Sequence, residues 1–164
     1  MSHVHDLRPH QTDLRTTQDP PPSHAGHAPH GLRGPIVWGL VVGALQAAAP
    51  LALPWLDQAT VQALALCMIA GVYVGFAVAD GRPQVIAVEC AVVGAFVLMA
   101  SAAVVSTPWV LVFAYTAHGV KDYWQHRRHF VANTRWWPPF CAAVDWLVAI
   151  VLVAEIIAGV SLQG

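Results

Sequence analysis

The residues best suited to chemistry lie in one stretch, from Tyr115 to His129. At about 100° per residue, five polar side chains of this stretch fall within an arc of roughly 80° on one face of a helix. They are Tyr115, His118, Asp122, His126 and His129. Imidazole and carboxylate groups on successive helical turns can hold a metal ion or exchange protons. The stretch therefore predicts a helix whose polar stripe faces inward.

Two more acidic residues are expected at the same depth in other apolar segments. Glu89 lies near the start of the third apolar segment and Asp145 near the start of the fifth. If the segments alternate in direction, Glu89, Asp122 and Asp145 come out roughly 6–10 Å inside one membrane boundary, with His118 about one and a half turns deeper. Ionisable groups at such depth rarely face lipid and mark functional sites by default.

Three functions fit such a polar cluster, and no catalytic residue is assigned. A metal ion held by His118, Asp122 and Asp145 would relieve carboxylate repulsion, so a metal-dependent membrane-embedded enzyme is one alternative. A proton relay or proton-coupled carrier is a second. The leading prediction is a structural or small-molecule-binding component, in which Lys121 or Arg128 pairs with an acid. A transition metal is the one cofactor that these residues suggest.

Composition assigns the chain to the membrane. The 164 residues are 57% hydrophobic, with eight Lys or Arg and nine Asp or Glu. A soluble domain is about one-quarter charged, because water must solvate its surface. So few charges, set between long apolar runs, indicate lipid as the main solvent. A net charge of −1 offers no basic surface to a nucleic acid, so the expected partner is the lipid bilayer.

Five apolar segments predict an all-α bundle of five transmembrane helices, at about 36–56, 59–79, 85–105, 109–129 and 139–161. Pro50 and Pro54 predict a bend near the end of the first segment. In the fourth, only residues 109–120 are convincingly apolar, well short of the ~20 needed to cross. That helix can cross only if other helices cover its polar face.

Positive charges predict the orientation of this bundle. The Lys and Arg residues all fall in the N-terminal tail, in the turn at 80–84, or around the connection between the last two segments. Such residues are enriched in cytoplasmic loops. We therefore expect a multi-pass protein of the cell's inner (plasma) membrane, with a cytoplasmic N-terminus and the C-terminus outside.

Residues 1–34 differ from the rest of the chain. This segment is rich in His and Pro and has no periodic apolar face. It has too little hydrophobic surface to offset the entropy of ordering, so we expect a disordered cytoplasmic tail. Its histidines could bind metal, but a solvated tail is the favoured interpretation.

Two Gly-x-x-x-Gly pairs are candidate helix-packing sites, Gly39 with Gly43 and Gly71 with Gly75. If the first two segments are antiparallel neighbours, both pairs lie near the same membrane face, where the backbones could approach closely. Chance in a Gly- and Ala-rich chain is an equal explanation. Because a bundle of this size has little interior, a homo-oligomer or a larger membrane complex is also considered.

The motifs around the polar stripe resemble a known family. His118-Gly119-Val120-Lys121-Asp122, then His126, and later Trp137-Pro138-Pro139-Phe140-Cys141 with Asp145, are similar to a family of small bacterial integral membrane proteins of unknown function. The resemblance covers the last two apolar segments and implies an uncharacterised membrane protein without an assigned activity. Histidine-box membrane oxygenases are a more distant comparison, because the chain has too few His-x-x-x-His and His-x-x-His-His groupings.

Overall fold

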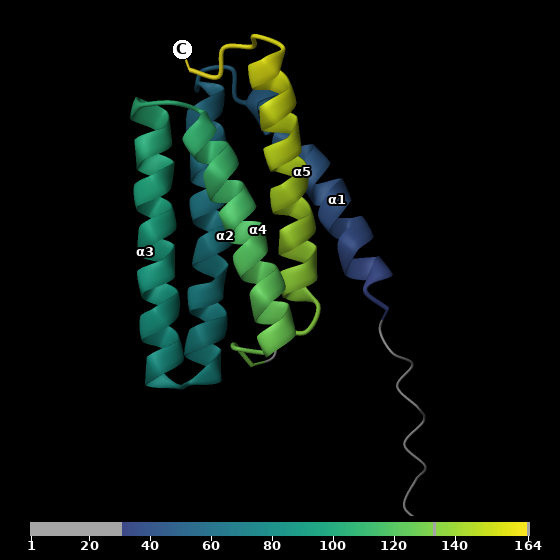
Figure 1. The fold of residues 1–164 in the computed structure, drawn as a ribbon, viewed down its shortest axis with the longest axis vertical. Helices are drawn as coiled ribbons and strands as arrows, with labels where there is room; N and C mark the ends of the chain where they lie inside the picture. The colour runs from purple at the N-terminus through teal and green to yellow at the C-terminus, as the bar shows by residue number, and fades with distance from the viewer. Residues whose placement is uncertain (1–30, 133, 164) are drawn as a thin grey trace, which may run out of the picture. The chain divides into compact units, whose positions relative to one another are not determined.

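The computed structural model describes residues 31–132 and 134–163, and this part of the chain is helical throughout, without strands. Figure 1 shows the helices in order: α1 (Arg33–Ala47), the short 3₁₀ helix η1 (Ala49–Ala52), α2 (Gln58–Asp80), α3 (Pro83–Val105), α4 (Trp109–Arg128) and α5 (Trp137–Ile157). The predicted all-helical class is confirmed. The predicted tail lies mostly outside the described residues, and its assigned range ends inside α1.

Three of these helices can cross a membrane by length and composition, namely α2, α3 and α5. With 23, 23 and 21 residues, they extend about 32–35 Å at 1.5 Å per residue. That length covers the ~30 Å hydrocarbon core of a bilayer. Large apolar side chains on their outer surfaces are exposed, among them Met68, Leu98 and Ile150. The chain thus has the build of a membrane protein.

Hydrogen bonds between loops tie the helices together at both ends. At one end, Arg82 Nη2 donates to Asp80 at 2.8 Å and to the Phe130 carbonyl at 2.7 Å, and Asp80 also accepts the Ala132 N–H. The α2–α3 turn is thereby held to the connection between α4 and α5. At the other end, Gln163 Nε2 donates to the Ala103 carbonyl at 3.0 Å, which holds the C-terminal segment to the end of α3.

Helix α4 has two distinct faces, as the sequence predicts. The inward face buries the aromatic and polar side chains of Tyr115, His118 and Asp122. The outward face exposes 46–65% of each of five apolar or aromatic side chains, those of Trp109, Phe113, Val120, Tyr123 and Trp124. The predicted inner face is confirmed for Tyr115, His118 and Asp122 and the lipid-compatible outer face for the five exposed residues, whereas His126 is half-buried and His129 is exposed.

The first predicted span, 36–56, differs from the observed structure. Helix α1 ends at Ala47, and the chain continues through η1 to Ala52. Pro50 supplies the physical reason, because its ring and missing N–H prevent an α-helix from continuing. The helix type changes near Pro50, where the sequence predicts a bend, but the helical part ends at Ala52 and does not reach residue 56.

The predicted pairing of the two glycine motifs is wrong. Helix α1 packs mainly on α5, not on α2. A Cβ on Gly39 would lie 2.8 Å from the Ala143 Cβ, and one on Gly43 would lie 3.1 Å from the Val144 Cα. At Gly71 and Gly75 a Cβ would meet no other part of the described chain within 4 Å. The Gly-x-x-x-Gly motif marks where a backbone can be approached, but it does not determine which helix approaches; in this structure the backbone and side chains of α5 do so.

Candidate functional site

The predicted polar cluster forms where α4 packs against α3 and α5. His118 and Asp122 come from α4, Asp145 from α5 and Glu89 from α3, and none of the four side chains is more than 1% exposed. They meet because Asp122 follows His118 by one turn, while antiparallel packing brings Glu89 and Asp145 to the same level. The structure thus brings together all four residues that the sequence singled out as the cluster.

His118 is the centre of a compact group of three potential ligands. Its Nδ1 lies 2.8 Å from Asp145 Oδ2 and 3.6 Å from Asp122 Oδ2. One ligand atom from each of these residues lies within 4.8 Å of the others. Ligand atoms around a tetrahedral zinc ion are about 3.4 Å apart. The three side chains could therefore close on a metal ion with small adjustments.

A second group on the same level is organised by Lys121. Its Nζ lies 3.1 Å from Glu89 Oε2 and 3.7 Å from Asp122 Oδ1. It also stands 3.3 Å from the centroid of the Tyr73 ring, a cation–π position. Gln125 Nε2 donates to the other oxygen of Glu89. Lys121 thereby links the Glu89 carboxylate to the group around His118.

Several buried atoms of the cluster have no hydrogen-bond partner among the described residues. They are His118 Nε2, both carboxylate oxygens of Asp122, Asp145 Oδ1 and Glu89 Oε2. A buried polar atom without a partner costs about 1–3 kcal/mol, and more when it is charged. Such atoms in a native protein call for an explanation, such as a bound ion, a proton or ordered water.

Aromatic rings enclose the imidazole of His118. The Phe96 ring lies edge-on with its centroid 4.8 Å away, and the Tyr73 ring lies edge-on at 5.9 Å. Tyr73 is fully buried and Phe96 is nearly so. These rings keep the surroundings of the cluster apolar, which strengthens the interaction of its charges with one another and with any cation.

The other residues predicted for the stripe lie elsewhere. Tyr115 belongs to a separate, neutral layer: its hydroxyl accepts from Gln46 Nε2 at 2.7 Å and donates to the Gln62 carbonyl at 2.8 Å. His126 is half-buried and lines a groove beside α1. His129 is exposed and ends α4 in the left-handed conformation, at φ 50°. The stripe therefore divides into three parts with different surroundings.

The sequence does not predict four polar side chains that belong to the charged cluster or to the neutral layer around Tyr115. Gln125 and Tyr73 adjoin the charged cluster, and Gln46 and Gln62 complete the neutral layer. Gln125 was detectable, since it lies three residues after Asp122 and so on the same helix face. No charge or periodicity marks the other three, because a single neutral polar residue in an apolar run has no distinctive pattern.

The chain matches no protein-family model, no curated protein and no solved structure. The resemblance of its last two helices to a bacterial membrane family stays a prediction.

Proposed function

We propose that this chain is a five-span, multi-pass protein of the inner (plasma) membrane, whose buried centre binds a cation. Helix α1 and η1 together extend about 30 Å, which supports the first crossing. The Lys and Arg residues of the described chain fall at the start of α1, in the α2–α3 turn, in the second half of α4 and in the connection to α5: Arg33, Arg82, Lys121, Arg127, Arg128 and Arg135. This asymmetry supports a cytoplasmic N-terminus.

The charge balance of the cluster supports cation binding. With a neutral His118, the carboxylates of Glu89, Asp122 and Asp145 outnumber the single ammonium of Lys121 by two. An uncompensated charge at this depth costs several kcal/mol. One divalent cation among His118, Asp122 and Asp145 would neutralise the excess and contact carboxylate oxygens that have no hydrogen-bond partner in the described part of the chain. The observation that carries the proposal is this trio of ligand atoms, buried and within 4.8 Å of one another.

The ligand types indicate a class of ion. One imidazole nitrogen with two carboxylate oxygens suits a transition ion such as Zn²⁺ or Fe²⁺. Mg²⁺ and Ca²⁺ prefer oxygen ligands alone. Three protein ligands leave a coordination position open to a small molecule, as catalytic zinc sites do. The proposal therefore joins the binding function to the metal-dependent one, and assigns no reaction.

A second candidate is proton binding at the same residues. The distance of 2.8 Å between His118 Nδ1 and Asp145 Oδ2 is that of an ordinary hydrogen bond. Two protons would neutralise the same charge excess as one divalent ion. On this alternative the cluster is the proton site of a relay or a proton-coupled carrier.

Metal content distinguishes the two candidates. We would purify the full chain in detergent, load it with Zn²⁺ or Fe²⁺, remove free metal and measure the elements bound. Asp145→Asn should lose about one equivalent relative to the unaltered protein. Glu155→Gln is the matched control, because Glu155 is an acid of the same helix that binds Gln58 at 2.6 Å. The N-terminal histidines are present in all three proteins, so the difference isolates the cluster. Equal metal in all three would overturn the metal proposal and leave the proton candidate.

The orientation has its own test. A periplasm-active reporter enzyme fused after Gly164 should be active, because the C-terminus is expected outside the cytoplasm. Activity of a cytoplasm-only reporter at the same position would contradict the five-span arrangement.

A further inference from the structure

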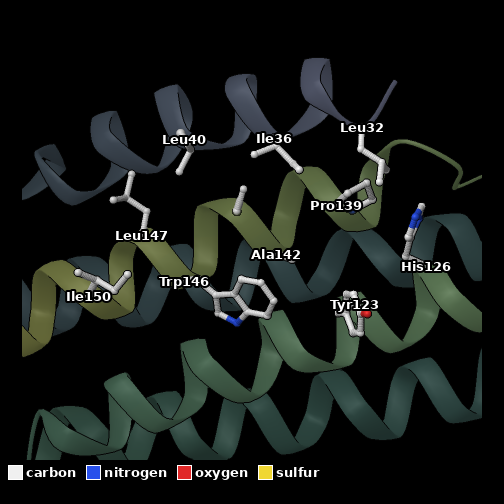
Figure 2. Close-up of a pocket in the computed structure, with 11 residues that line it drawn as sticks. Leu32, Ile36, Leu40, Tyr123, His126, Pro139, Ala142, Trp146, Leu147 and Ile150 are labelled. Carbon is white, nitrogen blue, oxygen red and sulfur yellow. The ribbon is translucent and has the colours of Figure 1, made fainter. Parts of the chain in front are cut away.

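A groove on the outer surface of the bundle is separate from the buried cluster (Figure 2). It has a volume of about 360 Å³ and lies between α1, α4 and α5. Ile36 and Leu40 of α1 form one wall, Ala142 of α5 forms the floor, and Leu147 and Ile150 lie toward one end. Almost all of the lining is apolar. Whereas Asp145 turns toward His118, the adjacent Trp146 lines this groove.

The length of the groove matches one leaflet of a bilayer. Along α5 it runs from Pro139 to Ile150, a distance of about 16 Å at 1.5 Å per residue. The hydrocarbon core of a bilayer is about 30 Å thick, so one leaflet supplies about half of that. The groove thus has the length of a single acyl chain that reaches from the interface to the membrane centre.

Positive charge gathers at one end of the groove only. Figure 2 places His126, Leu32 and Pro139 together at that end. Tyr123 also lines the groove, and its hydroxyl accepts hydrogen bonds from Arg127 Nε at 3.0 Å and Arg127 Nη2 at 2.6 Å. The Arg127 guanidinium also stacks on the Tyr123 ring. Arg127 is therefore fixed beside the mouth, where a phosphate would lie, and none of the lining residues is acidic.

We propose that this groove binds an anionic phospholipid of the cytoplasmic leaflet, with one acyl chain along α5 and the phosphate at Arg127 and His126. The apolar length fits the chain, and the cationic mouth fits the headgroup. A second copy of this protein is a poorer occupant, because a two-fold axis along the membrane normal would bring two cationic mouths to the same depth. The proposal rests on the proposed orientation in the membrane, which puts the charged end of the groove in the cytoplasmic leaflet, but it does not depend on cation binding by the cluster.

Native mass spectrometry of the full chain in detergent can test this site. The probes are dioleoyl phosphatidylglycerol and, as the zwitterionic comparison, dioleoyl phosphatidylcholine. The unaltered protein should bind one phosphatidylglycerol with a dissociation constant at least about fivefold lower than that for phosphatidylcholine, since one basic residue near an anionic headgroup accounts for about this factor. Arg127→Gln should remove most of this preference.

Two matched pairs of variants separate the groove from general surface effects. Arg128→Gln removes the neighbouring exposed charge and should keep the lipid preference. Leu40→Trp fills the groove from α1 and should weaken binding of both lipids, whereas Val41→Trp alters an exposed side chain outside the groove and should not. Equal loss in Arg127→Gln and Arg128→Gln would overturn the assigned headgroup site. Unchanged binding in Leu40→Trp would overturn the assigned acyl groove, and so would a dimer that only Leu40→Trp abolishes.

Discussion

The inner face of α4 carries two polar layers about one helical turn apart, and they are built differently. Around Tyr115, the side chains of Gln46 and Gln62 are neutral, and no buried polar side-chain atom of this layer lacks a partner in the described chain. Around His118 the side chains are mostly ionisable, and several of their buried atoms have no hydrogen-bond partner among the residues that the structure describes. Both layers lie on the same helix, one turn apart, and both are surrounded by apolar side chains.

The difference between the two layers distinguishes a polar layer that joins helices from one that is suited to bind a ligand. A polar group that lipid cannot solvate is completed by neighbouring helices when its role is to join them. The Tyr115 layer meets that condition and connects α1, α2 and α4. The His118 layer is brought together by the same helix packing, but several of its nitrogen and oxygen atoms have no hydrogen-bond partner in the described chain. In a membrane protein, a buried polar layer whose atoms lack hydrogen-bond partners therefore indicates a binding site better than a layer whose hydrogen bonds are complete.

The largest expected effect comes from Lys121→Met, which removes the only ammonium of the charged layer. Glu89 and Asp122 would lose their counter-charge, so the metal-free protein should lose about 3–5 kcal/mol of stability. Added Zn²⁺ should restore part of the loss, because a cation would replace the missing positive charge. Unfolding in mixed detergent micelles, with and without Zn²⁺, measures both effects. Arg128→Met, at an exposed position, is the control, and equal stability of the two variants would contradict the role of Lys121.

A smaller effect is expected where α1 meets α5. Gly39→Ala places a methyl group against Phe140 and Ala143, and such overpacking costs about 1–3 kcal/mol. Because α1 supplies Gln46 to the neutral layer and nothing to the charged one, the bound metal should not change. Gly75→Ala is the matched substitution in open space and should stabilise α2 by up to about 1 kcal/mol. Thermal unfolding together with elemental analysis would check this pair, and a loss of metal in Gly39→Ala would blur the distinction between the layers.

Tyr115→Phe should affect the neutral layer alone. It leaves the amide of Gln46 without its acceptor, which costs about 1–2 kcal/mol. Metal content should stay that of the unaltered protein. If Tyr115→Phe loses metal as fully as Asp145→Asn does, the two layers form one site and the comparison fails.

Asp57 provides the solvent-facing reference at the start of α2, and the smallest effect. Its carboxylate accepts the Thr60 N–H at 2.8 Å and the Thr60 hydroxyl at 2.7 Å, and these bonds lower the pKa of Asp57 below its usual 3.8. A lowered pKa in the folded state means that the stabilisation is present above the usual carboxyl pKa and is lost as the pH falls through the folded value. Asp57→Ala should cost about 0.5–1 kcal/mol at neutral pH. Thermal unfolding across acidic pH should show this difference vanish, and a difference that grows on acidification would contradict the assignment.

Much of the charged layer could be predicted from the sequence, because ionisable residues are rare in apolar segments. His118 and Asp122 follow from helical periodicity on α4. The positions of Glu89 and Asp145 could be predicted from their depth. When helices alternate in direction, residues that are equally far from the same membrane boundary lie at the same level. The exposed aromatic face of α4 follows from the same periodicity.

The partner of α1 could not be predicted in this way. Apolar side chains surround this helix, so no face of it is marked, and Gly39 and Gly43 show only that a close neighbour is tolerated. The neighbour is α5, whose Phe140 carbonyl and Ala143 side chain face Gly39 and whose Val144 backbone faces Gly43. The neutral layer could not be predicted for a related reason. Gln46 and Gln62 are recognisable as hydrogen-bond partners of Tyr115 only when the positions of α1 and α2 are known.

The position of Lys121 has a consequence for how the chain enters the membrane. In the proposed five-span arrangement, helix α4 would bring an ammonium, an imidazole and a carboxylate to a depth that lipid does not tolerate. Its counter-charge on α3, Glu89, is synthesised earlier, whereas Asp145 on α5 is synthesised later. Once α4 has been synthesised, Lys121 can therefore pair with Glu89 of the α2–α3 hairpin. His118 gains Asp145 only after α5 has been synthesised. Synthesis that stops before residue 137 would leave His118 between the rings of Tyr73 and Phe96 but without Asp145, its nearest polar partner.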